Sequence, residues 1–292
     1  MIKGIALMLL GCGILTAGDA LMKSLVATLP VGEVVGLRAI FAMATVLLLA
    51  PWVGGYSRLK ASSHSSVLLV SGLLVFNLFV FPASLPYLPL ADAIILAYTS
   101  PIWVVALAPL LLKEKVRWQQ WIAVLVGFLG AYLIIKPSGS MHWAVLLPLV
   151  VGLSVGLRDI VTRKIAAKER SLSIVFYANA LSLLIGLATF STGWSNVSSI
   201  QWVQMAISGV FLSTAQILMI EGFRLVEASV LSTIKYSSVL FAALFGYLFW
   251  GELFDVLGLL GALMIVTSGV LIVFFRDKAT PTSVETLPRE SR

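Results

Sequence analysis

The chain has 292 residues, of which 60% are hydrophobic and 11% are charged. Soluble globular domains carry about 45–50% apolar and about 25% charged residues, so the composition excludes that class and indicates an integral membrane protein. The net charge of +7 comes from basic residues in short gaps between apolar runs. Membrane topology explains basic residues in such gaps, so we expect no nucleic-acid partner. The single cysteine excludes an intramolecular disulfide.

Apolar windows of about 20 residues, the length at which a helix crosses a bilayer, recur along the chain. We predict an all-α membrane protein with ten transmembrane helices, at residues 3–22, 32–51, 66–86, 90–111, 119–136, 143–162, 171–191, 200–221, 228–249 and 255–275. The gaps are too short for a soluble domain, and residues 277–292 are predicted to form a disordered tail. Of the 20 lysines and arginines, 16 fall on the side of the two termini. The positive-inside rule assigns that side to the cytoplasm.

The second half of the chain repeats the first. A shift of 138 residues aligns LADAIILAYTSPIWVVALAPLLLKEK with VEASVLSTIKYSSVLFAALFGYLFWGE. The matched residues are Tyr98 with Tyr236, Ser100 with Ser238, Glu114 with Glu252 and, at a shift of 140, Asp19 with Asp159 and Lys23 with Arg163. We therefore predict two five-helix repeats, at residues 1–137 and 138–276. Because five is odd, the second copy is inverted in the membrane, as in many secondary transporters.

Lys235 lies inside the ninth predicted span, where a lysine costs about 2.5–3.5 kcal/mol at mid-bilayer. It falls opposite Ala97 in the alignment, so the charge is not part of the shared scaffold. One interpretation places it in an internal cavity as a ligand contact, because its helical row contains mostly small residues. The alternative is a lysine that reaches the cytoplasmic interface along its own stem.

Six charged residues near span ends form two predicted clusters: Asp19, Lys23 and Glu252 at one end, and Asp159, Arg163 and Glu114 at the other. Asp19 and Lys23 stand four residues apart, a spacing that lets opposite charges meet on one helix. One hypothesis is that the clusters latch alternately and that Asp19 or Asp159 carries a coupled proton. The other is that they cap helix ends at the water interface, where ion pairs contribute about 0–1 kcal/mol. Arg38, early in its span, is explained equally well by interface contacts.

Aromatic and polar residues within the spans supply further candidates for contact with a ligand. The aromatic ones, which lie away from span ends, are Tyr98, Trp103, Tyr177 and Tyr236. The polar ones, which need partners at depth, are Asn77, Asn179 and Gln216, and Thr99 follows Tyr98 directly. For each aromatic residue singly, ordinary helix packing is the competing interpretation.

The segment from Gly152 to Gly156 satisfies the G-x-S-x-G pattern of serine hydrolases. That motif requires a strand-to-helix turn and a histidine base, whereas this segment lies in an apolar helix and both histidines lie in or beside loops. The same residues fit a small-xxx-small motif for close helix packing, which we prefer. There is no nucleotide-binding G-x-x-x-x-G-K-[ST] motif and no Cys or His cluster, so we expect neither an enzyme, nor a cofactor, nor a metal.

Three segments, taken with the ten spans and the repeat, resemble the EamA-type branch of the drug/metabolite transporter superfamily over nearly the whole chain. They are GDALMKSLVATLPVGEVVGLRAIFA, AYTSPIWVVALAPLLLKEKVRWQQWIAVLVGFLGAYLIIKP and RDIVTRKIAAKERSLSIVFYANALS. The resemblance implies a proton- or substrate-gradient-driven permease or exporter in a bacterial inner membrane. It also implies a cavity lined by helices one to four and six to nine, with helices five and ten at the periphery.

The resemblance places Lys235 and Tyr236 where a base beside an aromatic residue meets ligand charge in members with anionic substrates. Two departures from the family pattern, Val239 as the repeat mate of Pro101 and no tryptophan near Gly11, make the aromatic-amino-acid exporters a poor fit. Carriers of S-adenosylmethionine or riboflavin are nearer.

We therefore expect a secondary active transporter that moves a small polar or amphipathic metabolite by alternating access. An intramembrane enzyme and a non-transporting receptor or scaffold are the alternatives. A homodimer stays open, because small-residue faces serve packing within and between chains.

Overall fold

The computed structural model describes residues 2–52, 55–61, 63–111, 118–135, 143–165, 171–225, 234–253 and 255–275. Within these residues the regular structure is helical. In the first half the helices are α1 (Ile2–Val26), α2 (Val31–Leu49), α3 (His64–Ser84), α4 (Leu90–Ala97), α5 (Ser100–Leu111) and α6 (Trp118–Ile135). In the second half they are α7 (Leu146–Ile165), α8 (Ser171–Ala188), α9 (Ser199–Leu225), α11 (Ser237–Trp250) and α12 (Val256–Phe274). Short 3₁₀ turns are η1 (Tyr56–Leu59), η2 (Trp143–Val145) and η3 (Thr189–Thr192).

These helices confirm an all-α, multi-pass membrane protein. Six helical stretches among the described residues are long and apolar enough to cross a bilayer. Four shorter apolar helices, at 118–133, 143–158, 237–250 and 256–271, occupy positions at which the remaining spans are predicted. The predicted tail, 277–292, lies outside the described residues.

The fourth predicted span, 90–111, is present as an apolar stretch long enough to cross a bilayer, at Leu90–Leu107, but it is not one continuous helix. It is interrupted after Ala97 by a turn at Tyr98 and Thr99, after which α5 begins at Ser100. The cause is Pro101, because proline has no N–H to donate to the carbonyl of Ala97 four residues earlier. Short turn bonds replace the helical ones, including Thr99 N–H to the Leu96 carbonyl at 3.2 Å. A second turn, at Lys235 and Tyr236, precedes α11, and its Tyr236 is the residue that the 138-residue shift aligns with Tyr98.

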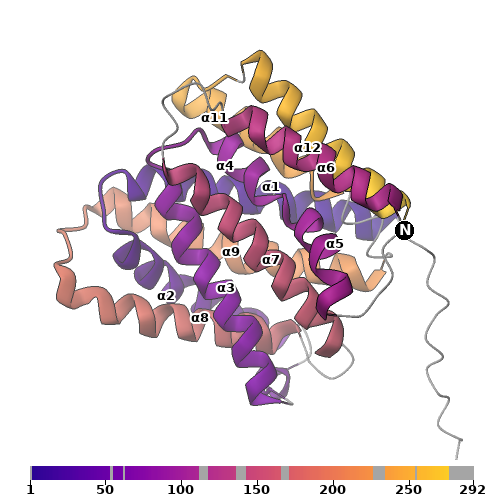
Figure 1. Ribbon diagram of the computed structural model, residues 1–292. Helices are drawn as coiled ribbons and strands as arrows, with labels where there is room; N and C mark the ends of the chain where they lie inside the picture. The colour runs from indigo at the N-terminus through magenta and orange to yellow at the C-terminus, as the bar shows by residue number, and fades with distance from the viewer. Residues whose placement is uncertain are drawn as a thin grey trace, which may run out of the picture.

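Helix packing joins the two halves of the chain throughout. The pair α1 and α9 has a counterpart in α7 and α3, and the pair α2 and α9 has one in α8 and α3. Helix α1 also contacts α11, as α7 contacts α4 and α5, and the remaining major pairs are α2 with α8, α4 with α11 and α6 with α12. Figure 1 shows α6 and α12 side by side along one edge of the bundle, as the family resemblance implies for helices five and ten.

Glycines allow the closest of these approaches. At the crossing of α2 and α8, a Cβ on Gly186 would overlap the backbone of Gly36. On α7, a Cβ on Gly152 would overlap Thr99, and one on Gly156 would lie 3.0 Å from the Cβ of Trp103. The small-xxx-small interpretation is therefore confirmed, since Gly152 and Gly156 hold α7 against the interrupted fourth span.

We predict that Gly186→Ala lowers the free energy of unfolding by about 1–3 kcal/mol, because its methyl group forces α2 and α8 apart in a packed interface. Thermal unfolding of the purified protein in detergent measures this. Gly72→Ala is the matched control, because a Cβ there has no neighbour within 4 Å and alanine favours the helix. Equal melting temperatures for the two variants would contradict the close crossing.

Candidate functional site

The two helix interruptions meet inside the bundle. The rings of Tyr98 and Tyr236, one from each interruption, pack edge to face with centroids 5.8 Å apart. Ser238, in the first turn of α11, lies close to Tyr98. A Cβ on Gly269 of α12 would overlap the Tyr236 hydroxyl, so this glycine makes room for the ring. The structure thus brings together two residues that the sequence nominated for ligand contact, at a place where both helices are locally unwound.

Lys235 lies on the same turn as Tyr236 and is half-buried. Its carbonyl accepts a hydrogen bond from the N–H of Ser238 at 3.0 Å, so its backbone forms part of the turn. The residues that follow it on the same helical row, Val239 and Ala242, are buried in the bundle. This surrounding favours the interpretation in which Lys235 faces the protein interior.

Asp19 and Lys23, which the sequence predicts to pair on α1, have different partners. The charge that attracts Asp19 is Arg38 on α2. Arg38 is only 4% exposed, so of the two explanations left open for it the structure favours burial within the protein. Its Nη1 donates to the Ser208 hydroxyl at 3.3 Å, and that hydroxyl donates to the carbonyl of Gly18 at 3.1 Å. Arg38 is drawn inward because α9 supplies a hydrogen-bond acceptor between α1 and α2.

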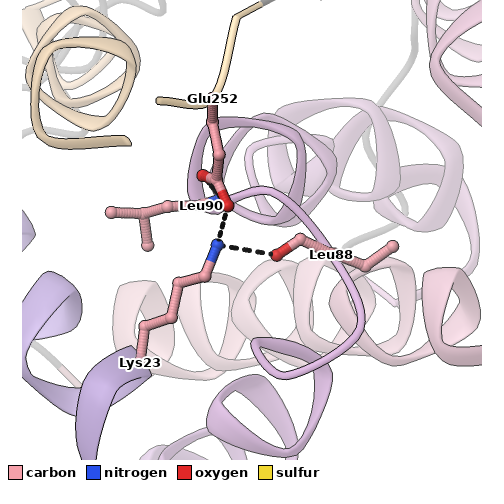
Figure 2. A network of polar contacts seen from close by, with 4 residues as sticks. All are labelled: Lys23, Leu88, Leu90 and Glu252. Carbon is pink, nitrogen blue, oxygen red and sulfur yellow. Dashed lines mark hydrogen bonds and ion pairs between the residues drawn. The ribbon is translucent and has the colours of Figure 1, made fainter. Parts of the chain in front are cut away.

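Lys23 instead forms an ion pair with Glu252, which follows α11. Figure 2 shows the lysine amino group between the Glu252 carboxylate and the carbonyl of Leu88, to which it donates at 3.1 Å. The other carboxylate oxygen accepts the N–H of Leu90 at 2.9 Å. We call this group of four residues the latch. It joins α1 and the start of α4 in the first half to the end of α11 in the second, as the predicted cluster requires.

Local backbone structure aims Glu252 at this position. Helix α11 ends in a left-handed Gly251, with the Gly251 N–H bonded to the Tyr247 carbonyl and the Glu252 N–H to the Gly246 carbonyl at 3.1 Å. The bond from the Gly251 N–H to the Tyr247 carbonyl is that of an αL cap, in which the left-handed residue turns the chain away from the helix axis. The carboxylate then meets the free N–H of the first residue of α4, where the helix dipole favours negative charge. The Trp250 ring, 4.9 Å from the Lys23 nitrogen, adds a cation–π contact.

Other predicted contacts lie elsewhere. Tyr177 packs edge to face on His64 at the start of α3, with centroids 6.4 Å apart. The Trp103 ring packs on Phe128 of α6, with centroids 5.3 Å apart. The amide nitrogen of Asn179 donates to Ser213 at 3.2 Å, a bond between α8 and α9. The Thr99 hydroxyl donates to the carbonyl of Leu96 at 2.8 Å.

Several buried polar atoms have no hydrogen-bond partner within the described residues. They are Oε1 of Glu33, Gln119 and Gln216, both amide atoms of Asn77, Nε1 of Trp103 and the hydroxyls of Ser154, Ser237 and Ser238. Buried polar groups are rarely left unpaired, so each of these atoms is a candidate contact for a polar ligand or for a group that moves. Ser237 and Ser238 belong to this set and adjoin the Tyr98 and Tyr236 rings.

Three predicted gating residues cannot be placed. Glu114 lies outside the described residues, and Asp159 and Arg163 belong to α7 but their side chains are not described.

One charged contact was missed by sequence reasoning. Glu33, in the first turn of α2, is fully buried and accepts the N–H of Ser195 in the other half at 3.0 Å. An acidic residue in the first turn of a helix is also what the helix dipole favours, so the sequence carried no separate signal for this contact.

Comparison with known proteins assigns the chain to a class. The profile of the EamA-like transporter family matches residues 2–136 and 142–274. An S-adenosylmethionine uptake transporter of Rickettsia felis is 26% identical over 279 residues, which cover 95% of each chain. The pseudopaline exporter CntI of Pseudomonas aeruginosa is 28% identical, over 92% of this chain and 95% of the relative.

A riboflavin transporter of Rhizobium johnstonii is 27% identical over 65% of this chain and 64% of its own length. A solved crystal structure covers 91% of this chain and 96% of its own with a TM-score of 0.66 at 17% identity, which shows a shared fold.

We predict that Lys23→Met and Glu252→Gln each lower the free energy of unfolding by about 2–3 kcal/mol, because each leaves a largely buried charge without its partner. The double variant should lose less than the sum of the two, since it leaves neither charge unpaired. Melting temperatures in detergent measure the cycle. Lys3→Met, an exposed lysine on the same helix, is the control. Strictly additive losses would show that the two charges do not interact.

Proposed function

Since the chain belongs to the EamA-like transporter family, we propose that it is a secondary active transporter that moves a small polar or amphipathic metabolite by alternating access. The assignment to membrane transport, and against an enzyme, follows from the family and from the relatives. The mechanism is our proposal, and the structural features below support it.

The observation that carries the proposal is the meeting of the two interrupted helices. The turns at Tyr98 and Tyr236 stand 138 residues apart in the chain, and their rings touch inside the bundle. Interrupted helices in a membrane leave backbone and side-chain groups available near the midplane, and transporters bind substrate and coupling ions there. We propose that substrate binds at this meeting point, with Lys235, Tyr236, Tyr98 and Thr99 around it.

The other residues nominated for substrate contact are supported unequally. Asn77 has unpaired buried amide atoms, and Trp103 an unpaired indole N–H, within the described residues. Tyr177 and Asn179 contact other helices in this state, so we propose for them a contact made after the helices move.

Inverted repeats at residues 1–137 and 138–276 account for the helix packing. Exchange of the two halves turns the pair α1 and α9 into α7 and α3, and it leaves the pairs α2 with α8 and α6 with α12 unchanged. The pair α1 and α11 likewise becomes α7 with α4 and α5, and the family profile matches the chain twice. These observations support two related half-structures, which could exchange roles at the two ends of the bundle.

The latch is proposed to be the gate at one end. It ties both halves together at Lys23 and Glu252, so that end cannot open while the ion pair is intact. In the sequence, Arg163 and Glu114 are the repeat counterparts of Lys23 and Glu252, and Asp159 is that of Asp19. We propose that these counterparts serve the other end. A coupled proton, if the transporter uses one, would bind Asp19 or Asp159.

The distribution of basic residues supports a bacterial inner-membrane location with both termini in the cytoplasm. In that orientation the latch faces away from the cytoplasm, since α1 starts at the cytoplasmic face and ends near Lys23.

The relatives carry the names of S-adenosylmethionine, pseudopaline and riboflavin carriers. We propose a substrate of similar size and polarity, with S-adenosylmethionine as the first compound to try. A receptor or scaffold, the alternative function, would move none of them.

The proposal predicts exchange of labelled S-adenosylmethionine or riboflavin across proteoliposomes, and arrest of that exchange when the latch is locked. Lys23→Cys and Glu252→Cys, made in a Cys12→Ala background, would be joined by a reducible bifunctional thiol reagent. Flux should fall to the level of empty liposomes and return on reduction, whereas either single cysteine should be insensitive to the reagent. Full flux through the joined protein would contradict alternating access at this end.

The topology is tested separately. We predict that a reporter that works only in the cytoplasm is active when it is fused after Arg292. A reporter that works only in the periplasm should be silent at the same position. The reverse pattern would overturn the orientation but leave the transport assignment standing.

A further inference from the structure

Arg38 is a charged residue in a position where burial costs free energy. It lies on α2, the helix at 31–49, and only 4% of it is exposed. Within the described part of the chain its guanidinium makes one hydrogen bond, to the neutral Ser208 hydroxyl at 3.3 Å. A guanidinium carries five N–H donors, and burying an arginine is costly unless a carboxylate and further acceptors satisfy it. A buried arginine with so few partners needs an anion that the structure does not supply.

Asp19 stands opposite Arg38 without touching it. The two charges attract each other across α1 and α2, yet no ion pair within 4.0 Å joins them among the described residues. The bridge of Ser208 and the Gly18 carbonyl holds the guanidinium beside α1 but leaves Asp19 out of the hydrogen-bonded chain. Asp19 is only partly exposed. Two opposite charges are thus held near each other without a direct bond between them within the described residues.

The position of this pair places it on a route to the aromatic residues. Asp19 lies one helical turn from Lys23 of the latch, on the side toward the middle of α1. Tyr98 lies near Asp19, and it contacts the ring of Tyr236. Going inward from the latch, the order is therefore the Asp19–Arg38 pair and then the two tyrosines.

We propose that Asp19 and Arg38 together bind a zwitterionic substrate. Arg38 donates hydrogen bonds to the carboxylate of the substrate, and Asp19 contacts its ammonium or sulfonium group. This inference rests on the proposed transport function and names its substrate class. A bidentate guanidinium matches a carboxylate, and a carboxylate beside two aromatic rings suits an organic cation. The two charges also neutralise a zwitterion without net charge transfer, which keeps the loaded site electrically balanced within the bilayer.

The competing role for Asp19 is carriage of a coupled proton alone. In that case Asp19 would make no direct contact with substrate, and Arg38 would only bias its protonation. The two roles differ in ligand selectivity. A proton carrier does not distinguish a zwitterion from its deaminated acid, whereas a direct contact with the ammonium group does.

The first test measures ligand binding to the purified full-length protein in detergent, with the thermal shift as the readout. The probes are S-adenosylmethionine and the proteinogenic amino acids, each with its decarboxylated amine and its deaminated 2-hydroxy acid, and riboflavin as a ligand that is not an amino acid. At least one zwitterion should bind at least about tenfold more tightly than both of its analogues. Binding of riboflavin alone, or of no zwitterion, would overturn the inference. Riboflavin flux in proteoliposomes would then leave the transport function intact.

The second test uses variants of the two charged residues. Arg38→Gln should weaken zwitterion binding at least about 30-fold and abolish the preference over the decarboxylated amine. Asp19→Asn should abolish the preference over the deaminated acid while keeping the preference over the amine. Arg38→Lys, which keeps the charge, should retain that last preference at lower affinity and remains informative if Arg38→Gln does not fold.

The matched control is Glu33→Gln. Glu33 is also a buried charge on α2, but its carboxylate bonds to the N–H of Ser195 and is not part of the Asp19–Arg38 pair. Both selectivities should survive in that variant. Loss of both preferences in Glu33→Gln, or unchanged selectivity in Asp19→Asn, would show that the pair acts through helix packing or protonation and would overturn direct recognition.

Discussion

A bilayer offers no water to hydrogen-bond with an interrupted helix, and this constraint governs the architecture. The chain leaves the helical path at Tyr98 in its first half and at Tyr236 in its second. In a segment exposed to lipid, such a turn would leave backbone N–H and C=O groups without hydrogen bonds. The turns are tolerated because protein surrounds them. Thr99 and Ser238 form short turn bonds, and α7, with glycines at its contact face, closes over the first interruption.

The same constraint explains how the charged residues are arranged. Lys23 on α1 has a carboxylate, a carbonyl and an indole ring as partners. Asp19 on α1 and Arg38 on α2 attract each other, but no ion pair within 4.0 Å joins them among the described residues. The fully satisfied group joins the two halves, which suits a gate. The incompletely satisfied pair lies deeper and is the more suitable place for a charged substrate.

Backbone groups contribute as much to these contacts as side chains. Glu252 is positioned by the αL cap at Gly251, and it binds the first N–H of α4. Glu33 binds the N–H of Ser195 in a similar contact between the two halves. Opening this end of the bundle would therefore break one ion pair and two carboxylate–amide bonds. A ligand that compensates those losses could drive the change, as any population shift requires.

Sequence reasoning and structure agree on the large features and diverge on side-chain partners. Composition, apolar windows and the 138-residue offset were enough for a helical membrane protein, for the small-residue face at Gly152 and Gly156 and for a cluster containing Lys23 and Glu252. They were not enough for the partner of Asp19, for the burial of Arg38 or for the contact of Glu33, because each depends on a helix other than the one that carries the residue.

By itself, the amino-acid sequence determined that this protein is helical and lies in a membrane that it crosses several times, since these follow from the cost of placing polar groups in hydrocarbon. Only the tertiary structure decided that the fourth span is interrupted at Tyr98, that Tyr98 meets Tyr236 and that Asp19 faces Arg38 and not Lys23. An i,i+4 spacing makes a contact on one helix available, but the partner that a buried charge takes is set by which neighbouring helix offers stronger compensation for its lost hydration.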